Sequence, residues 1–176
     1  MQLAYVLPEE GKPVNEALAA MAAALLDHGL NVIGTTQIDT PRPKSHKCDM
    51  DVRVLPGGEV IRISQDLGAN SRGCQLDPSA LEAAVALTEA RLEGADVLII
   101  NKFGKHEAEG RGFREVIGAA VMRDIPVIVG MNALNVAAFM AFCDHEAVQI
   151  APDIAALMDW AGPLMGTRAA GEWAAG

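Results

Sequence analysis

Short runs of apolar residues alternate along the chain with longer segments in which apolar residues recur at helical spacing. The run Val97-Leu98-Ile99-Ile100 is unbroken and mostly β-branched, which is typical of a strand buried on both faces of a sheet. Similar short runs at residues 2–7, 31–37 and 126–129 predict three more strands. The pattern therefore predicts buried strands that are separated by helices.

Helices are predicted between and after these strands, at residues 14–28, 78–93, 113–123, 135–143 and 154–165. Asn15 is the expected N-cap of the first helix, and Gly29 is placed for its C′ position. Asp77 and Pro78 form a favourable N-cap and N1 pair for the second helix. Residues 166–176 are small and polar apart from Trp173, and they predict a flexible C-terminal tail.

A β-hairpin is predicted around Pro56-Gly57-Gly58. Residues 49–55 and 59–64 flank this turn, and both carry β-branched residues that alternate with charged ones. Strands that alternate with helices favour right-handed crossovers and a mainly parallel sheet. We therefore expect one three-layer α/β/α domain over residues 1–165, with the hairpin inserted after the second strand.

Composition narrows the class of protein. Hydrophobic residues make up 51% of the 176 residues and aromatic residues only 4%, so Ala, Val, Leu, Ile and Met must build the core. No apolar run reaches the roughly 18–20 residues of a membrane helix, and the first residues lack the basic region of a secretion signal. Three widely spaced cysteines, Cys48, Cys74 and Cys143, argue against a disulfide framework. We expect a soluble protein of the reducing cytoplasm.

The charge distribution suggests an anionic small molecule as the partner. The net charge of -9 disfavours a nucleic-acid partner, and no membrane partner is expected, because no apolar run is long enough to span a bilayer. Residues 42–72 and 102–114 nevertheless hold ten of the 14 Lys and Arg residues, against six of the 23 Asp and Glu residues. Both windows are rich in loops, so they can form an anion site, although a solvated surface explains the same pattern equally well.

Four loops are expected on one rim of the sheet. Ligands of parallel sheets bind beyond the carboxyl ends of the strands. Residues 8–13, 101–111 and 131–135 each follow a predicted strand, and residues 65–76 are expected to reach the same rim. Two of these loops, 65–76 and 101–111, overlap the basic windows, which makes the rim the expected place of the ligand.

Three segments of this rim carry a family likeness: residues 64–68 (SQDLG), 72–77 (RGCQLD) and 101–110 (NKFGKHEAEG). They resemble an uncharacterised bacterial family that is distantly related to the small nucleoside-triphosphatases of the nucleotide-kinase-like P-loop group. The likeness covers roughly residues 2–150. It implies a P-loop NTPase-like fold with a mainly parallel sheet.

The phosphate-binding loop of that group is altered here. The Walker A pattern G-x-x-x-x-G-K-[ST] can be laid on residues 6–13, where Gly11 and Lys12 stay in register. Val6 replaces the first glycine, and Pro13 replaces the hydroxyl residue that binds Mg²⁺. Asn101 stands where the Walker B carboxylate is expected. Because both Mg²⁺ anchors are lost, we expect no ordinary hydrolysis of nucleoside triphosphates.

The preferred hypothesis is a non-hydrolytic oxyanion-binding protein. Backbone amides of a Gly-rich loop and the donors of Arg and Lys suit such a ligand, and the candidates are Ser71, Arg72, Gly73, Cys74, Lys102 and Lys105. The resemblance implies molybdate or tungstate, because relatives tend to be encoded with molybdenum transport and cofactor functions. In the simpler interpretation, the same cations only pair with neighbouring carboxylates.

Two other chemistries stay open. Gly104-Lys105-His106-Glu107 matches the glycine-lysine-x-glutamate motif of the related triphosphatases, so Glu107 would orient water if nucleotide hydrolysis survives. A soft metal could be bound by His46, Cys48 and Cys74, although the four-ligand spacing of a closed zinc site is missing. The Ala-rich first helix also suits close packing against a second copy in a homo-oligomer.

Overall fold

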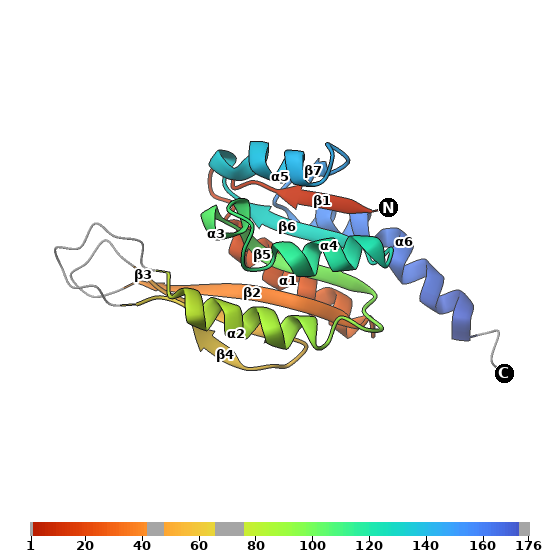
Figure 1. Cartoon of the computed structure of the whole chain (residues 1–176). Helices are drawn as coiled ribbons and strands as arrows, with labels where there is room; N and C mark the ends of the chain where they lie inside the picture. Colours follow the sequence, from red (N-terminus) through yellow and green to blue (C-terminus); the bar gives the residue numbers. More distant parts are fainter. Residues whose placement is uncertain (1, 42–47, 66–75, 173–176) are drawn as a thin grey trace.

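The computed structural model describes residues 2–41, 48–65 and 76–172 of the chain. These ranges contain seven strands: β1 Leu3–Val6, β2 Val32–Pro41, β3 Cys48–Leu55, β4 Val60–Arg62, β5 Val97–Phe103, β6 Val127–Met131 and β7 Val148–Ile150. They form one sheet in the order β4-β3-β2-β5-β6-β1-β7 (Figure 1). The five strands from β2 to β7 in this order are parallel, while β3 and β4 extend the sheet as an antiparallel hairpin.

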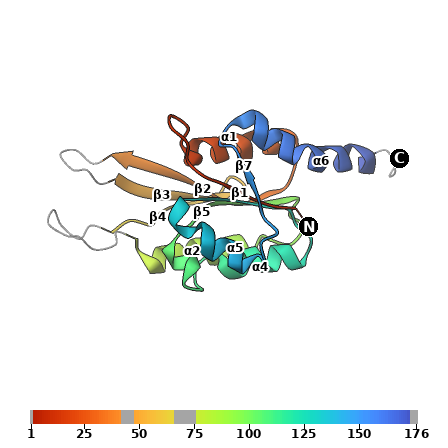
Figure 2. The ribbon, with the colours of Figure 1, turned by 90° about the horizontal axis from the view of Figure 1, so that it is seen from above.

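Helices cover both faces of this sheet. The described helices are α1 Val14–Asp27, α2 Pro78–Glu89, α3 Lys105–Ala108, α4 Arg114–Met122, α5 Val136–Phe142 and α6 Ile154–Glu172, with a 3₁₀ turn at Ala133–Asn135. Figure 2 shows α1 and α6 on one face of the sheet, and α2, α4 and α5 on the other. The fold is therefore the expected three-layer α/β/α arrangement with an inserted hairpin.

The central strands are buried on both faces because their side chains alternate between two hydrophobic cores. Val97 and Ile99 of β5 pack in the core that α1 and α6 share, while Leu98 and Ile100 pack in the core beneath α2 and α4. Because both faces of β5 are buried, every position from Val97 to Ile100 is apolar, which explains the continuous apolar run in the sequence. No helix in the described part of the chain is long and apolar enough to cross a membrane.

Several predicted element boundaries were wrong. For two of the strands, pairing with a neighbouring strand explains why they are longer than predicted. β2 continues to Pro41, past the predicted end at residue 37, because β3 pairs with it along its whole distal half. β5 continues to Phe103, beside β6. The three-residue β7 was missed, because it is exposed and too short for a periodic pattern.

Helix ends also differ from the predictions. Asn15 does not cap α1: the N-cap is Pro13, which lacks a side-chain acceptor, whereas Gly29 does take the predicted left-handed conformation after the helix. α2 ends at Glu89 rather than near 93. α6 runs through Glu172, beyond the helix end predicted at 165, so the predicted tail 166–176 begins as helix.

Candidate functional site

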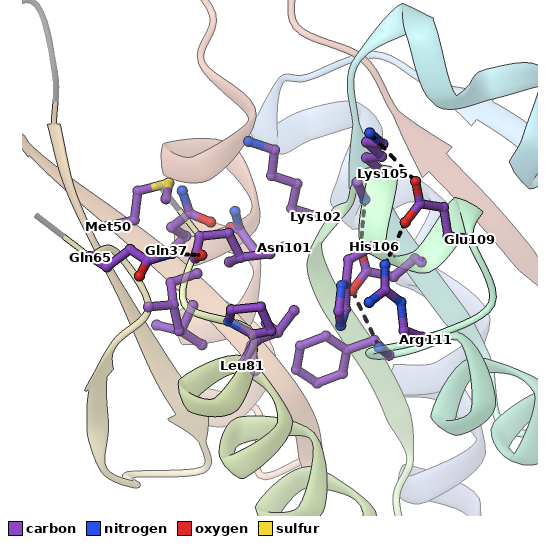
Figure 3. A pocket seen from close by; sticks show the side chains of 18 residues that line it. Gln37, Met50, Gln65, Leu81, Asn101, Lys102, Lys105, His106, Glu109 and Arg111 are labelled. Atoms are coloured by element: carbon purple, nitrogen blue, oxygen red, sulfur yellow. Dashed lines mark hydrogen bonds and ion pairs between the residues drawn. The ribbon is translucent and has the colours of Figure 1, made fainter. Parts of the chain in front are cut away.

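A pocket of about 610 Å³ opens at the carboxyl edge of the sheet, on the face covered by α2 and α4. Its walls come from β2, β3 and the residues after β4, and from the start of α2, the end of β5, and α3 (Figure 3). We call it the β5–α3 pocket. It lies where ligands of parallel sheets are expected, beyond the carboxyl end of β5.

One wall of the pocket is apolar. Side chains of β3 alternate, so that Met50 and Val52 face the pocket while their neighbours face away. Ile63 follows the hairpin, Leu81 projects from the first turns of α2, and Phe113 precedes α4. Except for the partly buried Met50, these side chains are buried, so the wall is rigidly packed from behind.

The opposite side of the pocket carries cations. Lys102 lies at the end of β5, is exposed, and forms no ion pair with any described residue. Lys105 and Arg111 both pair with Glu109, at 3.5 Å between Nζ and Oε1 in the case of Lys105. The hydrogen bond from Arg111, helped by Lys105, lowers the pKa of Glu109. Two cations thus share one carboxylate, while Lys102 has no carboxylate partner among the described residues.

The carboxylate of Glu107 accepts hydrogen bonds from the backbone around it. The side chain is 3% exposed, Oε2 accepts the Gly104 amide at 2.8 Å, and Oε1 accepts the Phe113 amide at 3.4 Å. The backbone at Gly112 passes so close that an added Cβ would lie 2.2 Å from Oε1. Glu107 therefore caps α3 and ties it to the start of α4. The sequence did not predict this short helix, because a single turn is too short to leave a periodic pattern.

His106 fixes α3 against α2. Its Nε2 lies 3.0 Å from Oε1 of Glu82, and the same oxygen accepts the Gly112 amide at 3.1 Å. His106 is 8% exposed, whereas the side chain of Glu82 is 50% exposed, so water reaches the contact from the Glu82 side. Glu82 thus holds both sides of the α3 turn. The pocket wall formed by α3 is anchored at two independent points, one on Glu107 and one on Glu82.

A chain of polar side chains crosses the edge of the sheet between β2 and α1. Nε2 of Gln37 donates to Asp39 at 2.7 Å, Asn15 donates to the same carboxylate at 2.8 Å, and Asn101 donates to Oδ1 of Asn15 at 2.8 Å. The carboxylate accepts only, so it fixes the orientation of each amide. Oδ1 of Asn101 is then buried without a hydrogen-bond partner among the described residues.

The loop at residues 8–13 stands apart from the pocket and does not line it. Nζ of Lys12 lies 3.5 Å from Glu9 and 3.7 Å from Asp153, and both pairs are about half exposed. The Lys12 amide donates to the carbonyl of Glu9 at 3.0 Å, which closes a tight turn. Gly11 takes a left-handed conformation in that turn. Lys12 is thus engaged by carboxylates of its own chain.

The predicted anion-binding residues are only partly placed. Lys102 and Lys105 both line the β5–α3 pocket. Ser71, Arg72, Gly73 and Cys74 lie outside the described residues, although Gln65 and Leu76, which border that segment, line the pocket. Of the four loops expected at the rim, 101–111 contributes most, whereas 8–13 and 131–135 do not contribute.

Sequence reasoning missed the apolar wall and the amide side chains Gln37 and Gln65. The wall residues belong to a hairpin and a helix, so their apolar pattern was assigned to the core. A sharper signal was available in the alternation of Met50, Val52 and Val54, which assigns all three to one face of the hairpin.

Of the three candidate ligands in the metal hypothesis, the structure describes Cys48. His46 and Cys74 lie outside the described residues, and no group of three potential metal ligands occurs within the ranges that are described. Cys48 and Cys143 are half-buried free thiols. Cys143 packs at the edge of the core, just after α5.

The sequence profile of a protein family described as "Protein of unknown function (DUF2478)" matches residues 3–160. The chain is also 30% identical over 142 residues to the molybdenum import ATP-binding protein ModC 2 of Bradyrhizobium diazoefficiens. That alignment covers 80% of this chain but only 16% of the relative, so the chain spans a small part of the relative's length.

Two solved structures share the fold. The solution structure of a human cancer-related nucleoside triphosphatase has a TM-score of 0.56, with 16% identity over 85% of this chain and 89% of that protein. The crystal structure of THEP1 from the hyperthermophile Aquifex aeolicus has a TM-score of 0.52, with 16% identity over 87% of this chain and 90% of that protein. These likenesses confirm the predicted P-loop NTPase-like α/β fold with its mostly parallel sheet.

Proposed function

We propose, from the premise that the chain belongs to the DUF2478 family and has a P-loop NTPase-like fold, that it binds a small anionic ligand in the β5–α3 pocket without Mg²⁺-dependent turnover. One observation carries the proposal. Lys102 lies on the pocket lining without a carboxylate partner in the described ranges, whereas Lys105 and Arg111 beside it share Glu109. A cation at a concave site that is not neutralised from within is suited to an anion.

The loop at residues 8–13 supports a binding function more than hydrolysis. A working phosphate loop presents free amides, a free lysine and a hydroxyl for Mg²⁺. Here Lys12 pairs with Glu9 and Asp153, and Pro13 offers neither an amide hydrogen nor a hydroxyl. Asn101 supplies an amide where a carboxylate would hold the ion. We therefore interpret residues 6–13 as a degenerate Walker A loop.

Molybdate and tungstate are the oxyanions that we propose to test first. The name of the ModC 2 relative associates a homologous segment with molybdenum import, and this supports the choice. Ser71, Arg72, Gly73 and Cys74 stay part of the proposed site. A cytoplasmic location and a homo-oligomeric state also belong to the proposal.

The test is calorimetric titration of the purified chain with molybdate, tungstate, sulfate, phosphate, and ATP with and without Mg²⁺. We expect saturable oxyanion binding and no Mg²⁺-dependent response to ATP. Lys102→Ala should weaken that binding by roughly tenfold to a hundredfold, as expected for one hydrogen bond to a charged group. Arg123→Ala is the matched control, because Arg123 is an exposed cation at the end of α4 that does not line the pocket.

The second candidate is residual nucleotide binding or hydrolysis, which the ATP-binding relative favours. In that case ATP would bind in a Mg²⁺-dependent manner and phosphate would be released. Either result would show that residues 6–13 still work as a phosphate loop and would overturn the non-hydrolytic proposal. Normal oxyanion binding by Lys102→Ala would overturn the assignment of the site instead.

A further inference from the structure

The β5–α3 pocket is much larger than an inorganic oxyanion. Its volume of about 610 Å³ falls within the range of roughly 300–1,000 Å³ that is typical of sites for organic ligands. A tetrahedral oxyanion has five heavy atoms, and one water molecule occupies about 30 Å³ of the liquid. An inorganic ion bound at Lys102 would leave most of this volume to water. The size of the pocket therefore favours an organic body attached to the anionic group.

The apolar wall points to the same kind of ligand. Val52 and Ile63 of the hairpin side, Leu81 of α2 and Phe113 are buried side chains that still face the pocket. Figure 3 shows Leu81 and Lys102 on different sides of the cavity. A hydrated ion makes no favourable contact with such a wall, whereas an organic body would displace water from it. The pocket is thus amphipathic, with a charged side and an apolar side.

Two amide side chains between the charged side and the apolar side of the pocket would make polar contacts with the organic body of the ligand. Nε2 of Gln37 donates to Asp39 at 2.7 Å, and Nε2 of Gln65 donates to the Leu76 carbonyl at 2.8 Å. Both partners only accept, so each amide is oriented with its NH₂ group toward that partner and keeps one further N–H. Neither Oε1 has a hydrogen-bond partner among the described residues. The pocket therefore offers two acceptors, each beside an N–H, to a ligand ring that carries N–H donors next to acceptors.

We infer that the ligand is a nitrogen heterocycle that bears an oxyanion group such as a phosphate. This inference rests on the proposed function, because it keeps the anion at Lys102 and adds the body that the rest of the pocket would recognise. The flat ring lies against the wall formed by Val52, Ile63 and Leu81. Its N–H edge faces the Oε1 atoms of Gln37 and Gln65.

The test compares three probes by calorimetry: inorganic phosphate, phenyl phosphate and guanosine monophosphate. Phenyl phosphate should bind at least tenfold more tightly than phosphate, because roughly 60 Å² of buried apolar surface corresponds to a tenfold change in affinity. Guanosine monophosphate should bind more tightly again, since its ring carries N–H donors. Lys102→Ala should weaken all three, which identifies the shared anion contact.

Two variants separate the wall from the acceptors. Gln37→Leu keeps the size of the side chain but removes the acceptor, so it should weaken guanosine monophosphate by about tenfold and leave phenyl phosphate unchanged. Leu81→Trp fills the pocket and should weaken both organic probes without affecting phosphate. Thermal unfolding checks that each variant folds. If Leu81→Trp does not fold, the series of three probes and Gln37→Leu still test whether the ligand is a heterocycle.

The outcomes distinguish the two proposals. If phosphate or molybdate binds through Lys102 but neither organic probe binds more tightly, the heterocycle is excluded and the anion site stands. The heterocycle is also excluded, and the anion site stands, if guanosine monophosphate binds no more tightly than phenyl phosphate. The same conclusion follows if Gln37→Leu leaves the affinity for guanosine monophosphate unchanged. If none of the probes or inorganic oxyanions binds, both proposals fail together.

Discussion

Glu107 is the residue for which a catalytic and a structural role are hardest to separate. It occupies the glutamate position of the triphosphatase-like motif, yet both of its carboxylate oxygens accept backbone amides, from Gly104 and Phe113. Gly112 packs against the same carboxylate, and a larger residue there would displace it. A loss of activity in a Glu107 variant would therefore not identify a catalytic base unless stability is measured at the same time.

Glu107→Ala should lower the free energy of unfolding by about 2 kcal/mol or more, because it leaves two sheltered amides without acceptors. Glu107→Gln keeps one oxygen acceptor and should cost less than Glu107→Ala. Urea unfolding followed by circular dichroism measures both. Glu109→Ala is the control, since Glu109 is an exposed carboxylate on the same turn. If Glu107→Ala unfolds at the wild-type midpoint, the structural role is wrong and the motif regains its catalytic interpretation.

At the level of elements, α2 positions part of the apolar wall, and Asp77 fixes where this helix begins. Its carboxylate accepts the hydroxyl of Ser79 at 2.6 Å and the amides of Ser79 and Ala80 at 3.0 and 3.2 Å. These bonds, that of the Ser79 side chain foremost, lower the pKa of Asp77 below its usual value. The ionised form is therefore favoured in the folded state.

A lowered pKa in the folded state means that the stabilisation is present above the pKa of the unfolded chain, about 3.9 for Asp, and is lost as the pH falls through the folded value. Asp77→Asn keeps a neutral cap at every pH. We expect the wild type to be more stable than Asp77→Asn at neutral pH, and the difference to shrink below about pH 4. Unfolding midpoints measured from pH 3 to pH 7 test this, and a constant difference would contradict it.

Elements with strong local signals could be predicted, and those that depend on distant partners could not. The N-cap Asp77 with Pro78 located the start of α2, and Pro56-Gly57-Gly58 located the hairpin turn. By contrast, β7 is held only by pairing with β1, and α3 is one turn held by Glu107 and Glu82. Neither leaves a periodic pattern in the sequence.

The same reasoning explains how much of the candidate site could be predicted. Lys102 and Lys105 were found because they follow a buried strand, and position after a strand is a local property. The apolar wall requires knowing that the hairpin and α2 enclose the space above β5, which no spacing reveals. The polar chain from Gln37 to Asn101 was missed for the same reason, because it joins side chains from three separate elements.

For the whole molecule, the sheet separates two features that are close together in a working P-loop enzyme. Residues 8–13 lead into α1, which lies with α6 on one face of the sheet (Figure 2). The apolar residues that line the β5–α3 pocket belong instead to the core beneath α2 and α4. Lys12 connects its loop to Asp153, just before α6, instead of extending toward a ligand. In this arrangement Lys12 joins two loops of the α1 face, and we propose that it takes no part in binding.

Lys12→Ala should therefore change the free energy of unfolding by no more than about 1 kcal/mol, the usual contribution of an exposed ion pair, and leave oxyanion affinity unchanged. Lys102→Ala should do the opposite, with little effect on stability and a large loss of affinity. Calorimetry and urea unfolding on both variants measure this crossed pattern. If Lys12→Ala abolished binding, the ligand would lie at the loop of residues 8–13, because Lys12 and its carboxylate partners among the described residues, Glu9 and Asp153, do not line the pocket.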